Sequence, residues 1–325
     1  MTGPLRPGAP RRADDRGMMD DAEHGGGSGR DSRPLVRRHP LLGLAVTVAS
    51  AVAVTATVVL GAEAFDGPGG KGGSGASVAN AAGTREISAR KVLHAVADRV
   101  REEEKDAEKD AEIDVPRDDQ FVYTREIVKE TDRRTGETEV RTAESWQSVD
   151  RSKRGWVDEI GGSGGWSEPL GRNESTFPPP DWEALERIPT DPAGLVRYVA
   201  AGLGIGKKPL EEIEKVEWRM IHSSLKGLAT RPMAPKGLRP AAYDALAAVP
   251  GMKAEPGVED GNGRPAVGVS YDYEFTRDQK LVFDEDSHEY LGERAIRTAL
   301  GRKKSYDQFV RLTGCAVVDE VKQRP

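Results

Sequence analysis

The stretch that decides the fold is Val267-Gly-Val-Ser-Tyr-Asp-Tyr-Glu-Phe275. Apolar and aromatic side chains occupy every second position, and small or polar residues separate them. Because successive side chains of a β-strand point to opposite faces, this alternation predicts a half-buried strand over 267–275. Asp260-Gly-Asn-Gly263 before it predicts a hairpin turn, and Leu281-Val-Phe283 after it predicts another strand.

A second group of strands is predicted nearer the amino terminus. Phe121-Val-Tyr-Thr-Arg-Glu-Ile127 alternates, and Asp132-Arg-Arg-Thr-Gly136 supplies a loop with Gly where a positive φ is expected. The run from Val140 to Val157 predicts the returning strands of an antiparallel series. A long irregular connection is expected over 161–180, which contains a Gly-rich run and three consecutive prolines.

Helical patterns precede and separate these two groups of strands. Apolar residues at helical spacing predict a helix that begins near Ser88, and Asp191-Pro192 is a cap followed by a favoured first residue. Further helices are predicted from Pro209 and from Pro240, the latter ending at Pro250-Gly251. The order of elements predicts an α+β fold, with a curved antiparallel sheet and helices on one of its faces.

Upstream of this domain, residues 40–62 form the most apolar segment of the chain. No charged residue occurs from Leu41 to Ala62. At about 1.5 Å per residue this run reaches roughly 33 Å, which is enough to cross a hydrocarbon core of about 30 Å. The sequence therefore predicts one transmembrane helix over 40–62, in contact with the lipid bilayer through residues 41–62.

The basic residues beside this segment predict its orientation. Arginines cluster on its amino-terminal side, which places that side in the cytoplasm; they are Arg30, Arg33, Arg37 and Arg38. Ala62-Glu63-Ala64 also fits a signal-peptidase site, but the apolar run exceeds the 7–15 residues of a signal core, so a retained anchor is favoured. The expected parts are a disordered cytoplasmic tail (1–39), the span (40–62), a Gly-rich linker (63–85) and an extracytoplasmic domain (86–325).

The composition excludes several classes of protein. Of 325 residues, 37% are hydrophobic and the formal net charge is -6, so neither a multi-span membrane protein nor a nucleic-acid-binding protein is expected. The single cysteine, Cys315, rules out an intrachain disulfide. Its apolar neighbours Ala316, Val317 and Val318 predict a buried, inert thiol.

Two short motifs resemble those of hydrolases. Gly161-Gly-Ser-Gly-Gly165 matches the nucleophile elbow around Ser163, but it lacks the preceding strand and following helix. Ser223 and Lys226 have the Ser-x-x-Lys spacing of penicillin-binding enzymes, but the companion motifs are absent. The match around Ser163 is better explained as an accident of a Gly-rich run, and Ser223 and Lys226 are better explained as surface residues at a solvated helix end. No catalytic residue and no enzymatic activity are therefore predicted.

The sequence gives only weak indications of a metal site or a ligand site. In an extended conformation Asp284, Asp286 and His288 would project from one face and so are candidates for a divalent cation, although an acidic turn is the default interpretation. No cofactor is predicted. The five tryptophans suggest either core packing or a ligand groove; they are Trp146, Trp156, Trp166, Trp182 and Trp218.

Several stretches together resemble a family of uncharacterised single-pass membrane proteins of actinobacteria. They are Ile188-Pro-Thr-Asp-Pro-Ala-Gly-Leu195, Tyr243-Asp-Ala-Leu-Ala-Ala-Val-Pro-Gly251, Gly263-Arg-Pro-Ala-Val-Gly-Val269, Leu281-Val-Phe-Asp284, Leu291-Gly-Glu-Arg294 and Thr313-Gly-Cys-Ala-Val-Val-Asp319 with Arg324-Pro325. The resemblance covers roughly 88–325. It implies a short inner tail, one span and an outer domain. Because the family's genes often lie near those of extracytoplasmic-function sigma factors, it also implies a signalling role.

These observations lead to one preferred hypothesis and two alternatives. The preferred function is a non-catalytic, membrane-tethered outer domain that binds or senses a ligand at the cell envelope. One alternative is an anti-sigma regulator that binds a sigma factor through the inner tail, although that tail is rich in Gly, Pro and Arg and lacks an amphipathic helical pattern. The other is a tethered envelope hydrolase.

Overall fold

A computed structural model describes residues 87–110, 115–159, 164–171, 174, 176–274, 278–299 and 304–325. The tail, span and linker predicted over 1–85 lie outside these residues. Within the described part of the chain, no helix is both long enough and apolar enough to cross a membrane.

The described strands form one nine-stranded antiparallel sheet, which confirms the predicted α+β class. Its strand order is β4-β3-β2-β1-β9-β8-β7-β6-β5, so each strand pairs with a sequence neighbour except at the β1–β9 junction. The strands are β1 (Phe121–Asp132), β2 (Thr138–Ser148), β3 (Gly155–Glu159), β4 (Gly165–Ser167), β5 (Met252–Glu259), β6 (Pro265–Tyr271), β7 (Lys280–Asp284), β8 (Tyr290–Ala299) and β9 (Lys304–Val318).

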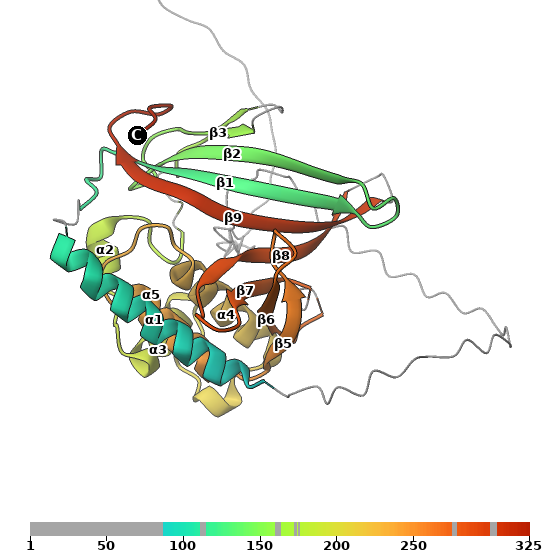
Figure 1. Cartoon of the computed structure of the whole chain (residues 1–325). Coiled ribbons are helices and arrows are strands. Elements are labelled where there is room, and N and C mark those ends of the chain that lie inside the picture. Colours follow the sequence, from blue (N-terminus) through green and yellow to red (C-terminus); the bar gives the residue numbers. More distant parts are fainter. Residues whose placement is uncertain are drawn as a thin grey trace, which may run out of the picture. The chain divides into compact units, whose positions relative to one another are not determined.

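The helices gather on one side of a curved sheet (Figure 1). Their apolar faces pack with Val267, Val269 and Phe283 of β6 and β7 into the main hydrophobic core. The capping predicted at Asp191 is present, since its carboxylate accepts a hydrogen bond from the Gly194 amide at 2.6 Å. The helices are α1 (Ala89–Asp110), α2 (Trp182–Glu186), α3 (Pro192–Gly202), the 3-10 turn η1 (Leu210–Glu212), α4 (Lys215–Ala229) and α5 (Leu238–Ala248).

Strand β9 joins the two groups of strands into one sheet. It pairs along its length with β1, from Phe121 opposite Val318 to Asp132 opposite Tyr306. On its other edge it pairs with β8. The carboxyl-terminal strand is therefore central, and it fixes how the first strands lie over the helices.

The predicted boundaries fail in two places. The strand expected over 267–275 ends at Tyr271, because the Asp272 amide turns to the carbonyl of Gly251 at 3.0 Å. The helix expected from Pro209 is only a 3-10 turn there. The α-helix starts at Lys215, after a capping box between Glu214 and Glu217.

Candidate functional site

The alternation of β1 and β9 separates two faces of the sheet. Thr124 lies opposite Ser145 of β2 and Cys315 of β9, and paired residues of antiparallel strands share a face. The same face carries Val122 opposite Val317. It is the face that meets the loop between α4 and α5, because residues of both line one cavity.

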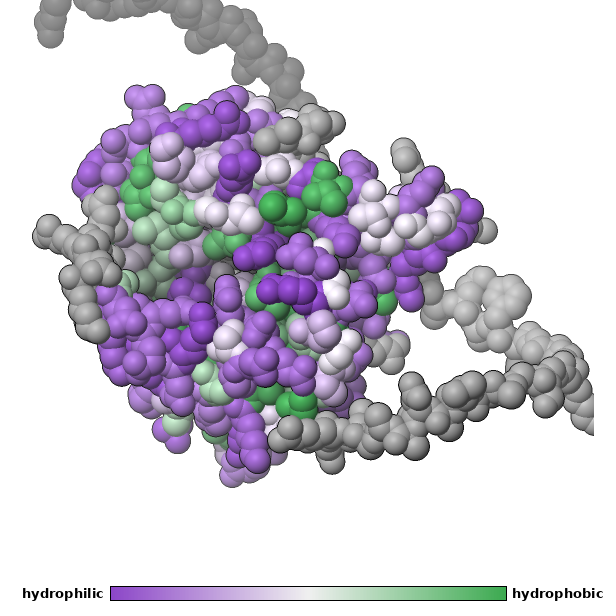
Figure 2. Space-filling view, viewed as in Figure 1, coloured by the Kyte–Doolittle hydropathy of each residue, from purple (hydrophilic) through white to green (hydrophobic). Residues whose placement is uncertain are grey.

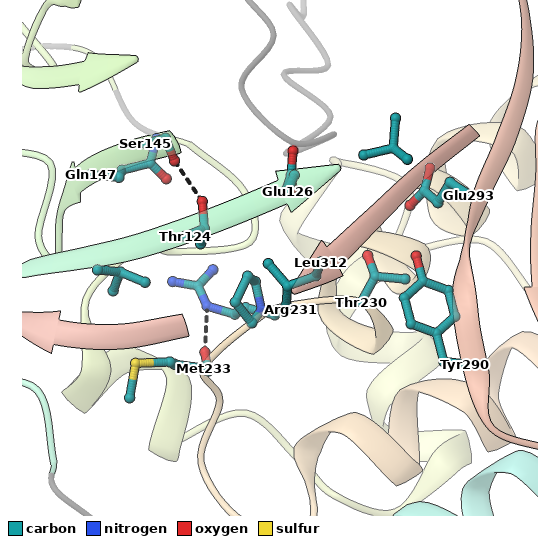
Figure 3. A pocket seen from close by; sticks show the side chains of 13 residues that line it. Thr124, Glu126, Ser145, Gln147, Thr230, Arg231, Met233, Tyr290, Glu293 and Leu312 are labelled. Carbon is teal, nitrogen blue, oxygen red and sulfur yellow. Dashed lines mark hydrogen bonds between the residues drawn. The ribbon is translucent and has the colours of Figure 1, made fainter. Parts of the chain in front are cut away.

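This cavity has a volume of about 100 Å³ and lies between the sheet and that loop (Figure 3). Strands β1, β2, β8 and β9 supply one wall, and residues 230–233 supply the other. Thr124 and Ser145 join their hydroxyls across the β1–β2 pair at 2.7 Å. The cavity is therefore built from segments far apart in the sequence.

Much of the cavity wall is apolar and only half-buried, in contrast to the closed main core. Figure 2 shows hydrophobic residues in the band between the upper strands and the helices. An apolar surface that remains accessible inside a concavity offers free energy of burial to a ligand, at roughly 25 cal/mol per Å². The apolar lining residues are Val122, Pro232, Met233, Val310 and Leu312.

Arg231 brings a positive charge to this wall. Its Nε donates to the carbonyl of Met233 at 3.2 Å, and its Nη2 donates to the carbonyl of Pro180 at 2.8 Å. In Figure 3 the guanidinium lies between β1 and the Met233 loop. Burial, with a smaller contribution from the charge of Arg151, lowers the pKa of Arg231 to about 10. The group still remains protonated at neutral pH.

Arg151 is a second guanidinium in the same region. It occupies the turn after β2 with a φ of 63°, and burial lowers its pKa as well. Asp181 is the acidic residue whose charge acts on Arg231, but its carboxylate caps α2 by accepting from the Ala184 amide at 2.8 Å. Among the described residues, neither Arg151 nor Arg231 has a carboxylate within ion-pair distance.

At the other end of the cavity, a lysine and a glutamate form an ion pair. Glu293 of β8 accepts from the Lys226 ammonium of α4 at 2.8 Å, and the Lys226 side chain is only 9% exposed. Tyr290 lies beside them, and burial raises its pKa well above the usual value. Lys226 is therefore held by a counter-ion, so it is not available as a base for Ser223.

The predicted metal candidates do not lie on an extended strand. Asp284 ends β7, and its Oδ1 accepts from the amides of Asp286 and Ser287 at 3.1 and 2.8 Å, which holds its pKa below the usual range. His288 takes a positive φ of 58° in the same turn. The acidic turn is thus present. In the part of the chain that the structure covers, no three His, Cys, Asp or Glu side chains are grouped to hold a metal.

Of the two predicted nucleophile motifs, one is placed and one is not. Ser223 and Lys226 lie on α4, one turn apart, with Lys226 paired as described. Ser163 lies outside the described residues.

Three of the five tryptophans form a row on the opposite face of the sheet. Trp156 lies opposite Trp146 on one side and Trp166 on the other. The carboxyl-terminal residues cover this row: Lys322 Nζ lies 3.5 Å from the Trp156 ring centroid, and the Trp146 indole donates to the Gln323 carbonyl. Trp182 and Trp218 lie in α2 and α4, so the tryptophans do not line a common groove.

The prediction of a buried Cys315 is wrong. The residue is exposed, and it lies on the face of β9 that pairs with Thr124 of β1. The surrounding protein nevertheless raises the pKa of the thiol to about 11, since a thiolate there is poorly solvated. Cys315 does not line the cavity itself, but it pairs with Thr124, which does.

We expect Cys315 to react with N-ethylmaleimide at pH 7.5 about tenfold more slowly in the folded chain than in the urea-unfolded chain. The pKa of about 11 against an ordinary 9.0 lowers the thiolate fraction roughly a hundredfold, and the greater intrinsic nucleophilicity of the thiolate offsets about tenfold of this. Mass spectrometry of the single cysteine gives both rates. An equal or faster rate in the folded chain would contradict the raised pKa.

Comparison with known protein families, curated proteins and solved structures finds no match to this chain. The resemblance to the actinobacterial family therefore stays a prediction. The two arginines were missed in the sequence because they belong to a turn and a loop, neither of which carries a recognisable motif.

Proposed function

We propose that this chain is a single-pass membrane protein whose extracytoplasmic domain binds a ligand at the cell envelope without catalysing a reaction. The apolar run over 41–62 and the arginines before it support the anchor and its orientation. The domain uses the concavity between the sheet and the α4–α5 loop as its binding site. Ligand occupancy there is what the protein senses or transmits.

One observation carries this proposal: the apolar wall of the concavity is left half-exposed. Val122, Val317 and Leu312 point to the helix side of the sheet, yet the helices do not close over them. In strands β6 and β7 of the same sheet, the corresponding apolar side chains are buried, since Val267 and Phe283 are at most 3% exposed. Ligand sites are concave and combine apolar surface with polar groups that orient the ligand. This cavity combines both, since five apolar residues line it together with hydroxyl, amide and charged side chains.

The topology can be tested with the single cysteine. A membrane-impermeant sulfonated maleimide added to intact cells should label Cys315, because the proposed orientation places the domain outside. The permeable N-ethylmaleimide serves as the positive control. Labelling that appears only after lysis would contradict the orientation, and a mature chain that begins at Phe65 would contradict the retained anchor.

Ligand binding in the concavity can be tested with a neutral apolar probe. We expect N-phenyl-1-naphthylamine to slow the modification of Cys315 at least severalfold in the full chain held in lipid nanodiscs. The matched control is the C315S/V140C variant, whose cysteine replaces a 62% exposed valine of β2. Equal slowing at both positions, or none at Cys315, would contradict a binding site at this face.

A further inference from the structure

Two tryptophan rings form a corner on the face of the sheet opposite the concavity. Trp156 of β3 lies across from Trp166 of β4, and their ring centroids are 4.9 Å apart with an angle of 70° between the ring planes. The rings therefore form two walls that stand nearly perpendicular, in contrast to a flat stack. Because Trp166 is 46% exposed, this corner opens to solvent.

A cation of the chain itself occupies this corner. The ammonium of Lys322 lies 3.5 Å from the Trp156 centroid and 4.9 Å from the Trp166 centroid. Both distances are within the roughly 6 Å at which the quadrupole of an aromatic ring attracts a positive charge. Among the described residues, this ammonium has no carboxylate and no hydrogen-bond acceptor as a partner, so the two rings hold it. Figure 1 shows the carboxyl-terminal end of the chain beside β3.

The surroundings of the corner tolerate a positive charge and leave the corner accessible. The guanidinium of Arg154 lies 5.0 Å from the Trp166 centroid, and it also pairs with the Glu168 carboxylate at 2.6 Å. Since Glu168 balances this charge, Arg154 adds little repulsion towards a cation in the corner. A Cβ at Gly165 would meet no atom within 4 Å, so the approach beside Trp166 is open.

Lys322 can leave the corner while its neighbours keep their places. Arg324 donates to the Glu144 carboxylate at 2.6 Å, and the Gln323 carbonyl accepts from the Trp146 indole. These contacts hold the carboxyl-terminal segment without Lys322. A primary ammonium is also a poor fit for the corner, because it carries three N–H donors and the rings offer no acceptor oxygen.

We propose that the corner between Trp156 and Trp166 binds a small quaternary ammonium compound, which displaces the side chain of Lys322. A trimethylammonium group carries a positive charge but no N–H, so it gives up no hydrogen bond to water when it contacts the rings. Lys322 acts as a tethered competitor, because its attachment to the same chain gives it a high effective concentration. The site lies on the other face of the sheet, so this inference is independent of the ligand proposed for the concavity.

Choline and 3,3-dimethyl-1-butanol are matched probes, because they have nearly the same shape and only choline is charged. The full chain is held in nanodiscs of phosphatidylglycerol, and the relaxation of the methyl protons of each probe in an NMR titration gives its dissociation constant. Choline should bind at least about tenfold more tightly than the neutral alcohol. Equal affinities, or no binding of choline up to about 100 mM, would overturn the proposal.

Variants of the exposed ring test the location of the site. Trp166→Leu should weaken choline binding at least about fivefold, because it removes one aromatic wall. Trp166→Phe keeps an aromatic face and should retain more of the affinity than Trp166→Leu. Since the side chain is 46% exposed, neither replacement opens a cavity in the core. Choline binding that Trp166→Leu leaves unchanged would place the cation elsewhere and overturn the assignment.

A variant of the tethered competitor should have the opposite effect. Lys322 has a φ of 71°, which asparagine tolerates, so Lys322→Asn empties the corner without straining the backbone. It should tighten choline binding at least about threefold. Lys207→Asn removes the same charge from an exposed loop and should leave the affinity unchanged. If both variants tighten binding equally, or if neither does, Lys322 is not the competitor and the proposal is overturned.

The type of nanodisc distinguishes a soluble ligand from a lipid headgroup. Phosphatidylcholine carries the same trimethylammonium group as choline, whereas phosphatidylglycerol carries none. Weaker binding of choline in phosphatidylcholine nanodiscs would support the proposal with the lipid headgroup as the ligand. Equal binding in both nanodiscs would support it with a soluble quaternary ammonium compound as the ligand.

Discussion

Replacing Glu293 by Leu should lower the free energy of unfolding by about 3–5 kcal/mol, because it strands the Lys226 ammonium in the protein interior. The two side chains are 23% and 9% exposed and meet at 2.8 Å. Water reaches the lysine too poorly to replace the lost carboxylate. Denaturant unfolding of the full chain, followed by circular dichroism, measures the effect.

A double replacement provides the internal check. Lys226→Met with Glu293→Leu removes both charges and fills the same volume with apolar atoms, so it should recover most of the lost stability. The matched control is Glu183→Leu, which removes the partner of Arg187 from an exposed pair and should cost less than about 1 kcal/mol. If the single Glu293→Leu variant also costs less than that, the buried pair is not structurally important.

Acidification should destabilise the fold through His222. Burial and the nearby Lys226 charge lower the pKa of this histidine from 6.5 to about 3. Its ring stacks on Tyr271 with centroids 5.0 Å apart, and its Nδ1 has no hydrogen-bond partner among the described residues. The folded chain therefore holds the ring neutral under conditions in which the unfolded chain protonates it.

The direction of the pH dependence of stability follows from this difference in proton binding. Below pH 6.5 the His222 ring binds a proton in the unfolded state but not in the folded state. The free energy of unfolding therefore falls as the pH falls from about 6.5 towards 3. Between pH 7 and pH 5 the loss due to His222 is about 2 kcal/mol. Ordinary carboxylates contribute little in this interval because they titrate lower.

His222→Phe should remove that loss. Phenylalanine keeps the stacking on Tyr271 and introduces no group that titrates, so the difference in unfolding free energy between pH 7 and pH 5 should shrink by about 2 kcal/mol. His288→Asn, in the β7–β8 turn, tolerates the positive φ and serves as the control. A pH dependence that His222→Phe leaves unchanged would show that another group is responsible.

Short-range patterns account for the parts of the fold that were predicted correctly. The alternation of Phe121–Ile127 and the hairpin at Asp260–Gly263 depend on neighbouring residues, and both match the structure. The cap at Asp191 is equally local. The end of β6 at Tyr271 was not predictable, because the competing partner of the Asp272 amide is the distant carbonyl of Gly251.

The candidate site shows the same difference between features that depend on neighbouring residues and features that depend on distant contacts. Ser163, Ser223 and Asp284 attracted attention because motifs are defined over a few consecutive residues. In the described part of the chain, Asp284 accepts hydrogen bonds from amides of its own turn, and Ser223 is a half-buried residue of α4. Arg151 and Arg231 are eighty positions apart and belong to no motif, so their proximity was visible only after folding.

Residue order along the chain was enough to establish the α+β class, most helix and strand positions and the expectation of an apolar span, because each depends on periodicity or composition over fewer than about 25 residues. Folding in three dimensions decided that β9 pairs with β1, which buried one face of these strands under the carboxyl-terminal residues and left the other half-open. Long-range pairing is chosen by the packing of whole faces against each other, and no local pattern records that choice.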